Sequence, residues 1–180
     1  MNDSNFRKLV LAMLCDIHAK LEIQDSVDPG LISKAILSDN EWALLWEYPG
    51  LLESEENPEH VAFVADVLDM WQDIESSFDS LSDADKEKVS NLSAPFGNNP
   101  KFPGFDGNHE AKYLSAARFM VDELKRFQEF GGRVNNSHME TIAGYSRMLE
   151  IHAGFDENFG SRSADELVMI LNERRHPANR

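Results

Sequence analysis

Residues 57–81, NPEHVAFVADVLDMWQDIESSFDSL, decide the fold of this chain. Apolar side chains recur along them at steps of three and four, which is the spacing of one face of an α-helix. Asn57-Pro58 supplies a start signal, because proline is favoured at the first helical position. The apolar face runs for about six turns, so we expect a long central helix. Its face consists of Val61, Val64, Ala65, Leu68, Trp71, Ile74, Phe78 and Leu81.

The same periodicity occurs on both sides of this segment. Residues 3–21 carry one apolar stripe, and Asp28-Pro29 repeats the start signal before a second helix. Further helices are expected over 41–52 (short and broken by Pro49-Gly50), 82–92, 108–130, 137–153 and 163–171. Three pairs have the spacing of a capping box, which satisfies free backbone N–H groups at a helix start; they are Ser82/Asp85, Ser137/Glu140 and Ser163/Glu166. The N-terminal stripe consists of Phe6, Leu9, Val10, Met13, Leu14, Ile17 and Leu21.

The main loop is residues 94–107, APFGNNPKFPGFDG. Its prolines and glycines oppose a helix, and its phenylalanines indicate packing against the body. Nowhere does the sequence alternate between apolar and polar residues long enough to predict a strand. We therefore predict an all-α fold: a single-domain bundle of about six to eight helices around one core, with this central Pro/Gly/Phe-rich loop. The domain is expected to cover residues 1–173, followed by a basic, frayed tail at 174–180.

The chain of 180 residues has a formal net charge of −15. Residues 1–90 contain 20 acidic and 6 basic side chains, and residues 91–180 contain 12 and 11. An acidic surface repels nucleic acid and anionic membranes, so neither is an expected partner. A nucleic-acid-associated regulator would require the basic groups of the second half to converge on one face. These groups are Lys112, Arg118, Lys125, Arg126, Arg133 and Arg147, with the tail.

Cysteine content and hydropathy indicate the compartment. Cys15 is the one cysteine, so the chain forms no internal disulfide, as is usual in a reducing compartment. The first residues, MNDSNFRKLVLAML, are typical of an amphipathic helix rather than a signal peptide. No apolar run approaches the ~20 residues that cross a bilayer. We expect a cytoplasmic protein.

Two stretches carry a resemblance to a known family. In residues 102–127, FPGFDGNHEAKYLSAARFMVDELKRF, a Phe-x-Gly-Phe-Asp loop leads into Glu-Ala-Lys-Tyr-Leu and Arg-Phe-Met-Val; YSRMLEIH follows at 145–152. These motifs resemble the YfbU family, and EWALLWEY at 41–48 is similar in kind to its middle region. The resemblance implies a bacterial, cytosolic, mainly helical protein. It implies no activity and no catalytic residues.

One cluster offers an enzymatic interpretation. Asp106, His109 and Glu110 lie at the end of the main loop and just after it, and they are candidates for an acid–base or metal-assisted hydrolase site. The alternative is that Asp106 caps the following helix and His109 lies in its first turn. A second grouping, Cys15 and His18, is one helical turn apart, as in a nucleophile–base pair. A small buried thiol is the alternative for Cys15.

An acidic stripe offers a metal-binding interpretation. Asp66, Asp69 and Asp73 lie on one helix face, and carboxylate oxygens are ligands for Mg²⁺ or Ca²⁺. The alternative is a solvated face opposite the apolar stripe. Since the Glu-x-x-His pairs of di-iron bundles do not occur, we expect no di-iron site.

An aromatic cluster is the candidate interaction surface. Trp42 and Trp46 are four residues apart and share a helix face, with Tyr48 close by. Together with Phe102 and Phe105 they are candidates for an exposed aromatic groove that contacts a peptide or a second copy. The alternative is a second packing layer over the core.

The sequence contains no motif of a P-loop, a dinucleotide-binding loop or a hydrolase nucleophile elbow. We therefore expect no cofactor and favour a non-catalytic protein-interaction module that self-associates, as a homo-oligomer and most simply a dimer, or that binds another protein. A carboxylate- and histidine-dependent hydrolase is the alternative. A nucleic-acid-associated regulator is the third hypothesis.

Overall fold

A computed structural model describes residues 3–24, 26–51, 56–155, 161–176 and 178. Within these ranges every regular element is helical, and a single β-type bridge joins Phe105 to Asn136. The predicted all-α class is confirmed. The elements are α1 (Asp3–Lys20), α2 (Pro29–Leu37), α3 (Trp42–Glu47), α4 (Glu59–Ser80), α5 (Asp83–Leu92), α6 (Ala111–Arg118), the π-helical turn η1 (Phe119–Glu123), the 3₁₀ turn η2 (Gln128–Phe130), α7 (Ile142–His152) and α8 (Ala164–Asn172).

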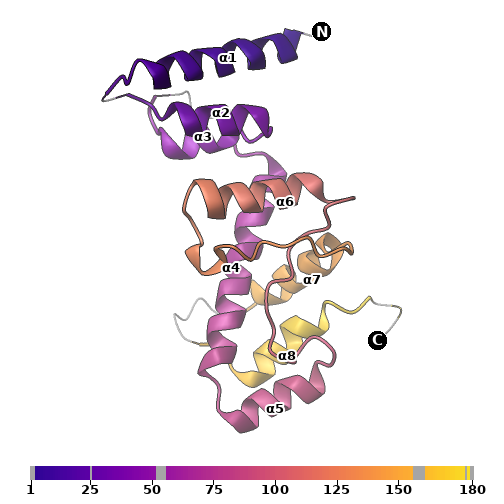
Figure 1. The fold of residues 1–180 in the computed structure, drawn as a ribbon. Helices are drawn as coiled ribbons and strands as arrows, with labels where there is room; N and C mark the ends of the chain where they lie inside the picture. The colour runs from indigo at the N-terminus through magenta and orange to yellow at the C-terminus, as the bar shows by residue number, and fades with distance from the viewer. Residues whose placement is uncertain (1–2, 25, 52–55, 156–160, 177, 179–180) are drawn as a thin grey trace.

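The helices form an elongated stack (Figure 1). α1 lies at one end, α2 and α3 lie beneath it, and α5 lies at the opposite end. α4 runs along the body, with α6, α7 and α8 packed against it. Val64, Leu68 and Trp71 of α4 have no exposed surface. The apolar stripe that predicted this helix is therefore the centre of the core.

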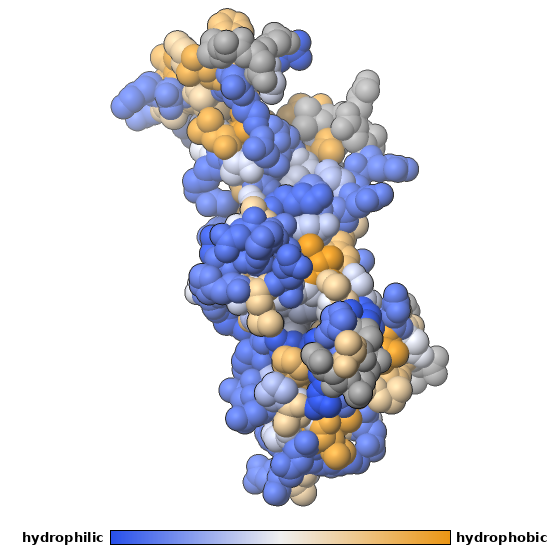
Figure 2. All heavy atoms as spheres, turned by 90° about the vertical axis from the view of Figure 1, so that its right-hand side faces the viewer, coloured by the Kyte–Doolittle hydropathy of each residue, from blue (hydrophilic) through white to orange (hydrophobic). Residues whose placement is uncertain are grey.

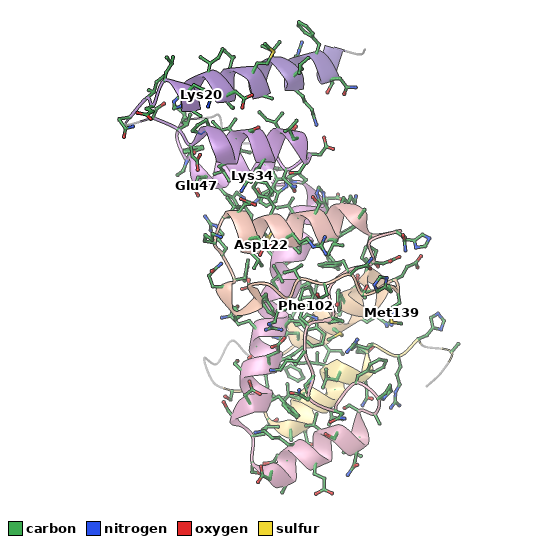
Figure 3. All side chains as sticks on the ribbon, viewed as in Figure 1. Lys20, Lys34, Glu47, Phe102, Asp122 and Met139 are labelled. Carbon is green, nitrogen blue, oxygen red and sulfur yellow. The ribbon has the colours of Figure 1, made fainter. Side chains whose placement is uncertain are left out.

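The main loop packs into the body as the sequence indicated. Phe102 is 3% exposed, and its ring lies 6.1 Å from the ring of Trp71 and 5.4 Å from that of Phe130. Figure 3 shows Phe102 inside the body. Gly104 has a φ of +91°, and a Cβ placed there would lie 1.9 Å from the carbonyl oxygen of Asn135. Glycine at position 104 therefore lets the loop approach the segment before α7.

The predicted helix over 108–130 is wrong in its second half. The α-helix ends at Arg118 and continues as a π-helical turn, in which the N–H of Leu124 donates to the carbonyl of Phe119 at 3.0 Å. The buried side chains Phe119, Met120 and Val121 lie on this turn. π-helical turns are short insertions in α-helices, and this one leads directly to the end of the helix. Lys125 and Phe127 then adopt left-handed φ values of 55° and 50°, which end the helix.

Two of the three predicted capping pairs are present. Ser82 accepts from the backbone N–H of Asp85, and Ser163 and Glu166 form a complete capping box. The Ser137/Glu140 pair is wrong, because α7 begins five residues after Ser137, at Ile142. The start of α7 is bound instead by a side chain from another segment, described below.

Candidate functional site

Many of the exposed large apolar side chains among the described residues lie on the outer side of α1. The inner side rests on α2, where Cys15 is 8% exposed. Lys8 also anchors α1 by ion pairs to Asp39 and, at 3.5 Å, Glu41. We call the outer apolar side chains the α1 face: Phe6 (52% exposed), Leu9 (51%), Val10 (39%), Met13 (57%), Leu14 (54%) and Ile17 (52%).

The α1 face differs from the sequence-based expectation. We expected its stripe to join the common interior, but the stripe points away from α2 and the body. Apolar atoms are visible over this end of the molecule in Figure 2. Leu11 and Leu21 are also exposed, so the apolar surface covers most of the circumference that α2 leaves uncovered. The breadth of apolar residues in α1 is the sequence signal that could have indicated this exposed surface.

The tryptophans of the predicted aromatic groove are packed against the body. Trp42 is 5% exposed, and its ring lies 5.1 Å from the ring of Trp46 and 6.1 Å from that of Phe119. The indole N–H of Trp42 donates to Asn40 at 3.0 Å. Trp46 is half-buried and donates to Asn57 at 2.7 Å. These contacts favour the alternative of a second packing layer.

The other three candidates of the groove have structural partners as well. Phe102 and Phe105 are 3% and 0% exposed. The hydroxyl of the half-buried Tyr48 accepts from the backbone N–H of Asp28 at 2.8 Å, next to the N-terminus of α2. No continuous aromatic groove is formed by these five side chains, all of which the structure describes.

Asp106, His109 and Glu110 lie close together, but the two carboxylates accept hydrogen bonds that hold a turn and the start of a helix. Asp106 accepts from the backbone N–H groups of Asn108 and His109 and, at 2.7 Å, from Nδ1 of His109. The hydrogen bond from His109 lowers the pKa of Asp106, and the same contact raises the pKa of His109. Asp106 therefore stays an anion that caps this turn, and the capping interpretation is favoured.

Glu110 holds the start of α7. Its carboxylate accepts from the backbone N–H groups of Thr141 at 2.6 Å and Ile142 at 2.8 Å, and from the Thr141 hydroxyl at 2.8 Å. It also accepts from the N–H of Asp106 at 2.9 Å. With Glu110 only 3% exposed, these donors replace the water that an ionised carboxylate would otherwise need. The residue supplies the cap that the sequence assigned to Ser137 and Glu140.

The three aspartates of the acidic stripe on α4 have different surroundings. Asp73 binds His152 at 2.8 Å and Arg162 at 2.7 Å. Although burial raises its pKa, the hydrogen bonds from His152 and Arg162 outweigh burial and hold the pKa at about 2. Burial and the neighbouring Asp66 raise the pKa of Asp69. Among the described residues no His, Cys, Asp and Glu side chains are grouped so as to hold a metal ion.

Cys15 and two of the candidate basic residues also pack against, or pair with, other parts of the fold. Burial against α2 raises the pKa of the Cys15 thiol, which disfavours the thiolate that a nucleophile requires. Of the basic groups, Arg133 forms a two-point ion pair with Glu75 at 2.9 and 2.8 Å, and the guanidinium of Arg126 lies 5.1 Å from the ring centre of Trp46.

No described helix is both long and apolar enough to cross a membrane.

The model of the YfbU domain matches residues 1–173. The chain belongs to the YfbU family. A curated relative, the UPF0304 protein MJECS11 of Methanocaldococcus jannaschii, is 27% identical over 115 residues, which are 61% of this chain and 65% of that protein. The chain therefore spans less than two thirds of the length of this relative. The expected YfbU resemblance is confirmed, and the match includes α1.

Proposed function

We propose that this YfbU protein is a non-catalytic interaction module, located in the cytoplasm, that self-associates through the α1 face. The observation that carries the proposal is that Phe6, Met13 and Ile17 are each more than half exposed on a helix supported on one side by α2. An apolar patch of this size in water marks an interaction site or an aggregation hazard.

The exposed apolar area of α1 approaches that of a specific interface. Taking roughly 150–200 Å² for a fully exposed large side chain, the exposed fractions of the α1 face and its neighbours correspond to an apolar area on the order of 700 Å². The neighbours are Leu11, Leu21 and Ile23, which are 42%, 66% and 49% exposed. A stable protein–protein interface removes about 800 Å² from each partner. The α1 surface alone is close to that value.

Charge supports a second copy of the chain as the partner. The whole chain has a net charge of −15, so two copies repel each other over most of their surfaces. α1 contains Arg7, Lys8 and Lys20 against Asp3 and Asp16. Contact between two α1 helices therefore brings together a segment that is not acidic, unlike the N-terminal half as a whole.

The spacing of the α1 face is self-complementary. Phe6, Val10, Met13 and Ile17 follow one another at steps of four, three and four, which is the same order from either end. In an antiparallel pair, Phe6 lies opposite Ile17 of the second copy, and Val10 opposite its Met13. A two-fold axis then relates the copies, as in most homodimers, and the helix dipoles oppose each other favourably.

Sedimentation velocity over a concentration series tests the proposal. The wild-type protein of 20.4 kDa should sediment as a dimer, and Met13→Glu should sediment as a monomer with an unchanged circular dichroism spectrum. Met169→Glu is the matched control, because Met169 of α8 is 51% exposed and Met13 is 57% exposed. The control should remain dimeric. A wild-type monomer at every concentration contradicts the proposal, and so does a monomer that binds lipid vesicles through α1 instead.

The hydrolase alternative receives less support, because Asp106, His109 and Glu110 are used in capping turns and helices. A nucleic-acid-associated regulator is also less supported. Arg133 is paired with Glu75, and Arg147 donates to the carbonyl groups of Glu173 and Arg175 at the end of α8.

A further inference from the structure

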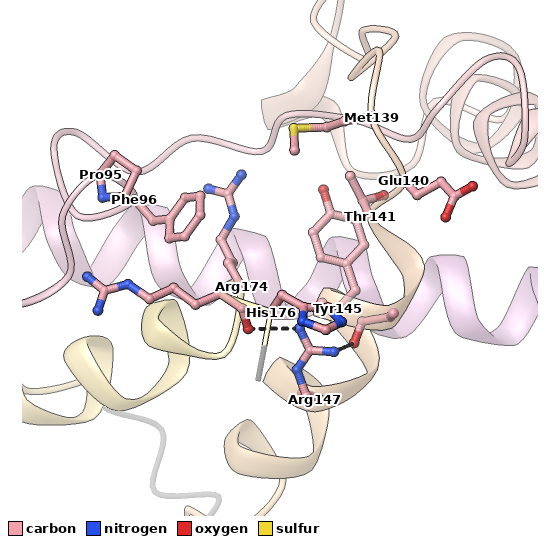
Figure 4. A pocket seen from close by; sticks show the side chains of 12 residues that line it. Pro95, Phe96, Met139, Glu140, Thr141, Tyr145, Arg147, Arg174 and His176 are labelled. Atoms are coloured by element: carbon pink, nitrogen blue, oxygen red, sulfur yellow. Dashed lines mark hydrogen bonds between the residues drawn. The ribbon is translucent and has the colours of Figure 1, made fainter. Parts of the chain in front are cut away.

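A cavity of about 560 Å³ lies far from α1, between the start of the main loop, the segment before α7 and the end of α8 (Figure 4). Its apolar wall contains Phe96, Met139 and Tyr145, and its basic side contains Arg147, Arg174 and Arg175. Sites for small organic molecules have volumes of roughly 300–1,000 Å³ and combine apolar walls with a few polar groups. The cavity has both properties.

Arg174 is the unusual member of this cavity. Its guanidinium lies 4.4 Å from the ring centre of Phe96 and 5.5 Å from that of Trp71. Burial lowers the pKa of its guanidinium. A guanidinium nevertheless stays protonated in proteins. Its guanidinium forms no hydrogen bond or ion pair within the described part of the chain.

The neighbouring polar groups have partners of their own. Arg147 donates to the carbonyls of Glu173 at 2.9 Å and Arg175 at 3.1 Å, and the guanidinium of Arg175 donates to Ala94. The Tyr145 hydroxyl donates to Gly104 at 2.8 Å. The carboxylate of Glu140, which is 72% exposed, points away from Arg174 in Figure 4. Arg174 is therefore the arginine of this cavity whose guanidinium donors all remain available for a ligand within the described part of the chain.

We propose that this cavity binds a small organic anion: an aromatic ring that carries a carboxylate or a phosphate. The oxyanion pairs with the Arg174 guanidinium, whose fork of N–H groups fits two oxygens of either group. The ring lies against Phe96, Met139 and Tyr145. A charged group in apolar surroundings is costly without a counter-ion, so binding supplies the partner that the fold leaves out.

NMR titration of the full chain with benzoate, phenyl phosphate, inorganic phosphate and neutral benzyl alcohol tests the inference. Benzoate or phenyl phosphate should shift the backbone amide signals of Phe96, Met139 and Gly144, and benzyl alcohol should bind at least about tenfold more weakly, which is the usual loss when a charged hydrogen bond is absent. Comparing benzoate with phenyl phosphate distinguishes a carboxylate from a phosphate ligand. If inorganic phosphate binds as tightly as phenyl phosphate, the aromatic part of the inference is wrong.

Variants assign the binding to Arg174. Arg174→Gln should weaken binding of the better probe by about tenfold or more, and Arg174→Lys, which keeps the charge but loses the fork, should fall between this variant and the wild type. Arg126→Gln is the matched control, because Arg126 also lies over an aromatic ring, that of Trp46, but does not line this cavity. Equal binding by wild type and both Arg174 variants would overturn the inference. So would no amide shift with any probe. Because the cavity lies far from α1, the same titration can be repeated with the Met13→Glu variant. Binding of the probes should not depend on self-association.

Discussion

α4 in the body and α1 at one end of the molecule share the same amphipathic pattern, but the burial of their apolar faces differs. In the body, the apolar stripe of α4 is covered by other helices, so that Leu68 and Trp71 have no exposed surface. On α1, Leu9 and Leu14 repeat the pattern and remain 51% and 54% exposed. Polar groups are paired in both regions: Asp73 and Glu110 of the body are each held by several donors, and Lys8 of α1 pairs with Asp39 and Glu41. Helical periodicity thus predicts an amphipathic helix, but it does not predict whether other helices of the same chain cover its apolar face.

The largest effect is expected from Trp71 in the body. Trp71→Ala removes a fully buried ring that packs against Phe102 and Tyr145 and supports Arg174. We expect the free energy of unfolding to fall by about 3–5 kcal/mol, measured by urea denaturation. A loss below about 1 kcal/mol would mean that α4 is not the centre of the core.

A smaller effect is expected from the non-local cap of α7. In the wild type, several N–H groups donate to the carboxylate of Glu110. Glu110→Gln places an amide NH₂ group, itself a donor, against some of them, and it should lower the free energy of unfolding by about 2–3 kcal/mol. Glu140→Gln is the matched control, since Glu140 is exposed and should change stability by less than about 0.5 kcal/mol. Urea denaturation of both variants checks the difference. Equal stabilities would remove the role assigned to Glu110.

The Asp73 ion pairs should make the body sensitive to acid. The pKa of Asp73 is about 2 in the folded protein, against 3.8 for an unperturbed aspartate. The contribution of Asp73 is therefore fully present above pH 4 and is lost as the pH falls toward 2. After allowance for partial solvent screening it amounts to about 1–2 kcal/mol. In Asp73→Asn, the free energy of unfolding should fall less steeply between pH 4 and pH 2. An unchanged slope would contradict this account of Asp73.

The smallest effect is expected on α1 itself. Within the monomeric Met13→Glu background, Leu14→Ala should change the free energy of unfolding by less than about 0.5 kcal/mol, because Leu14 is exposed. Leu68→Ala in the same background should cost about 2–5 kcal/mol. Urea denaturation of the two variants compares the same substitution on two helices. Similar losses would show that α1 is part of the core.

Local signals predicted much of the fold. The stripe of α4, the N-cap Asp28 and the Ser163/Glu166 box act within one or two helical turns, so the sequence alone contains their geometry. The cap that Glu110 gives to α7 spans 31 residues and depends on the path of the main loop. No local pattern contains that information.

The candidate sites were harder to predict for a related reason. Trp42 and Trp46 have the composition of an interface, but Asn40 and Asn57 accept from their indole N–H groups, and the tertiary structure places Phe119 against Trp42. Arg174 was assigned to a basic tail, yet its side chain lies between Phe96 and Trp71. In both cases the surroundings, and not the residue type, decide the role.

Disulfide trapping between α1 helices tests the central claim most directly. In a Cys15→Ser background, Val10→Cys and Met13→Cys are prepared separately and mixed under oxidising conditions. An antiparallel pair places residue 10 opposite residue 13 of the second copy, so the mixture should form a crosslinked dimer faster than either variant alone. Crosslinking of each variant alone at the same rate as the mixture would contradict the antiparallel register, and no crosslinking in any sample would contradict pairing through the α1 face.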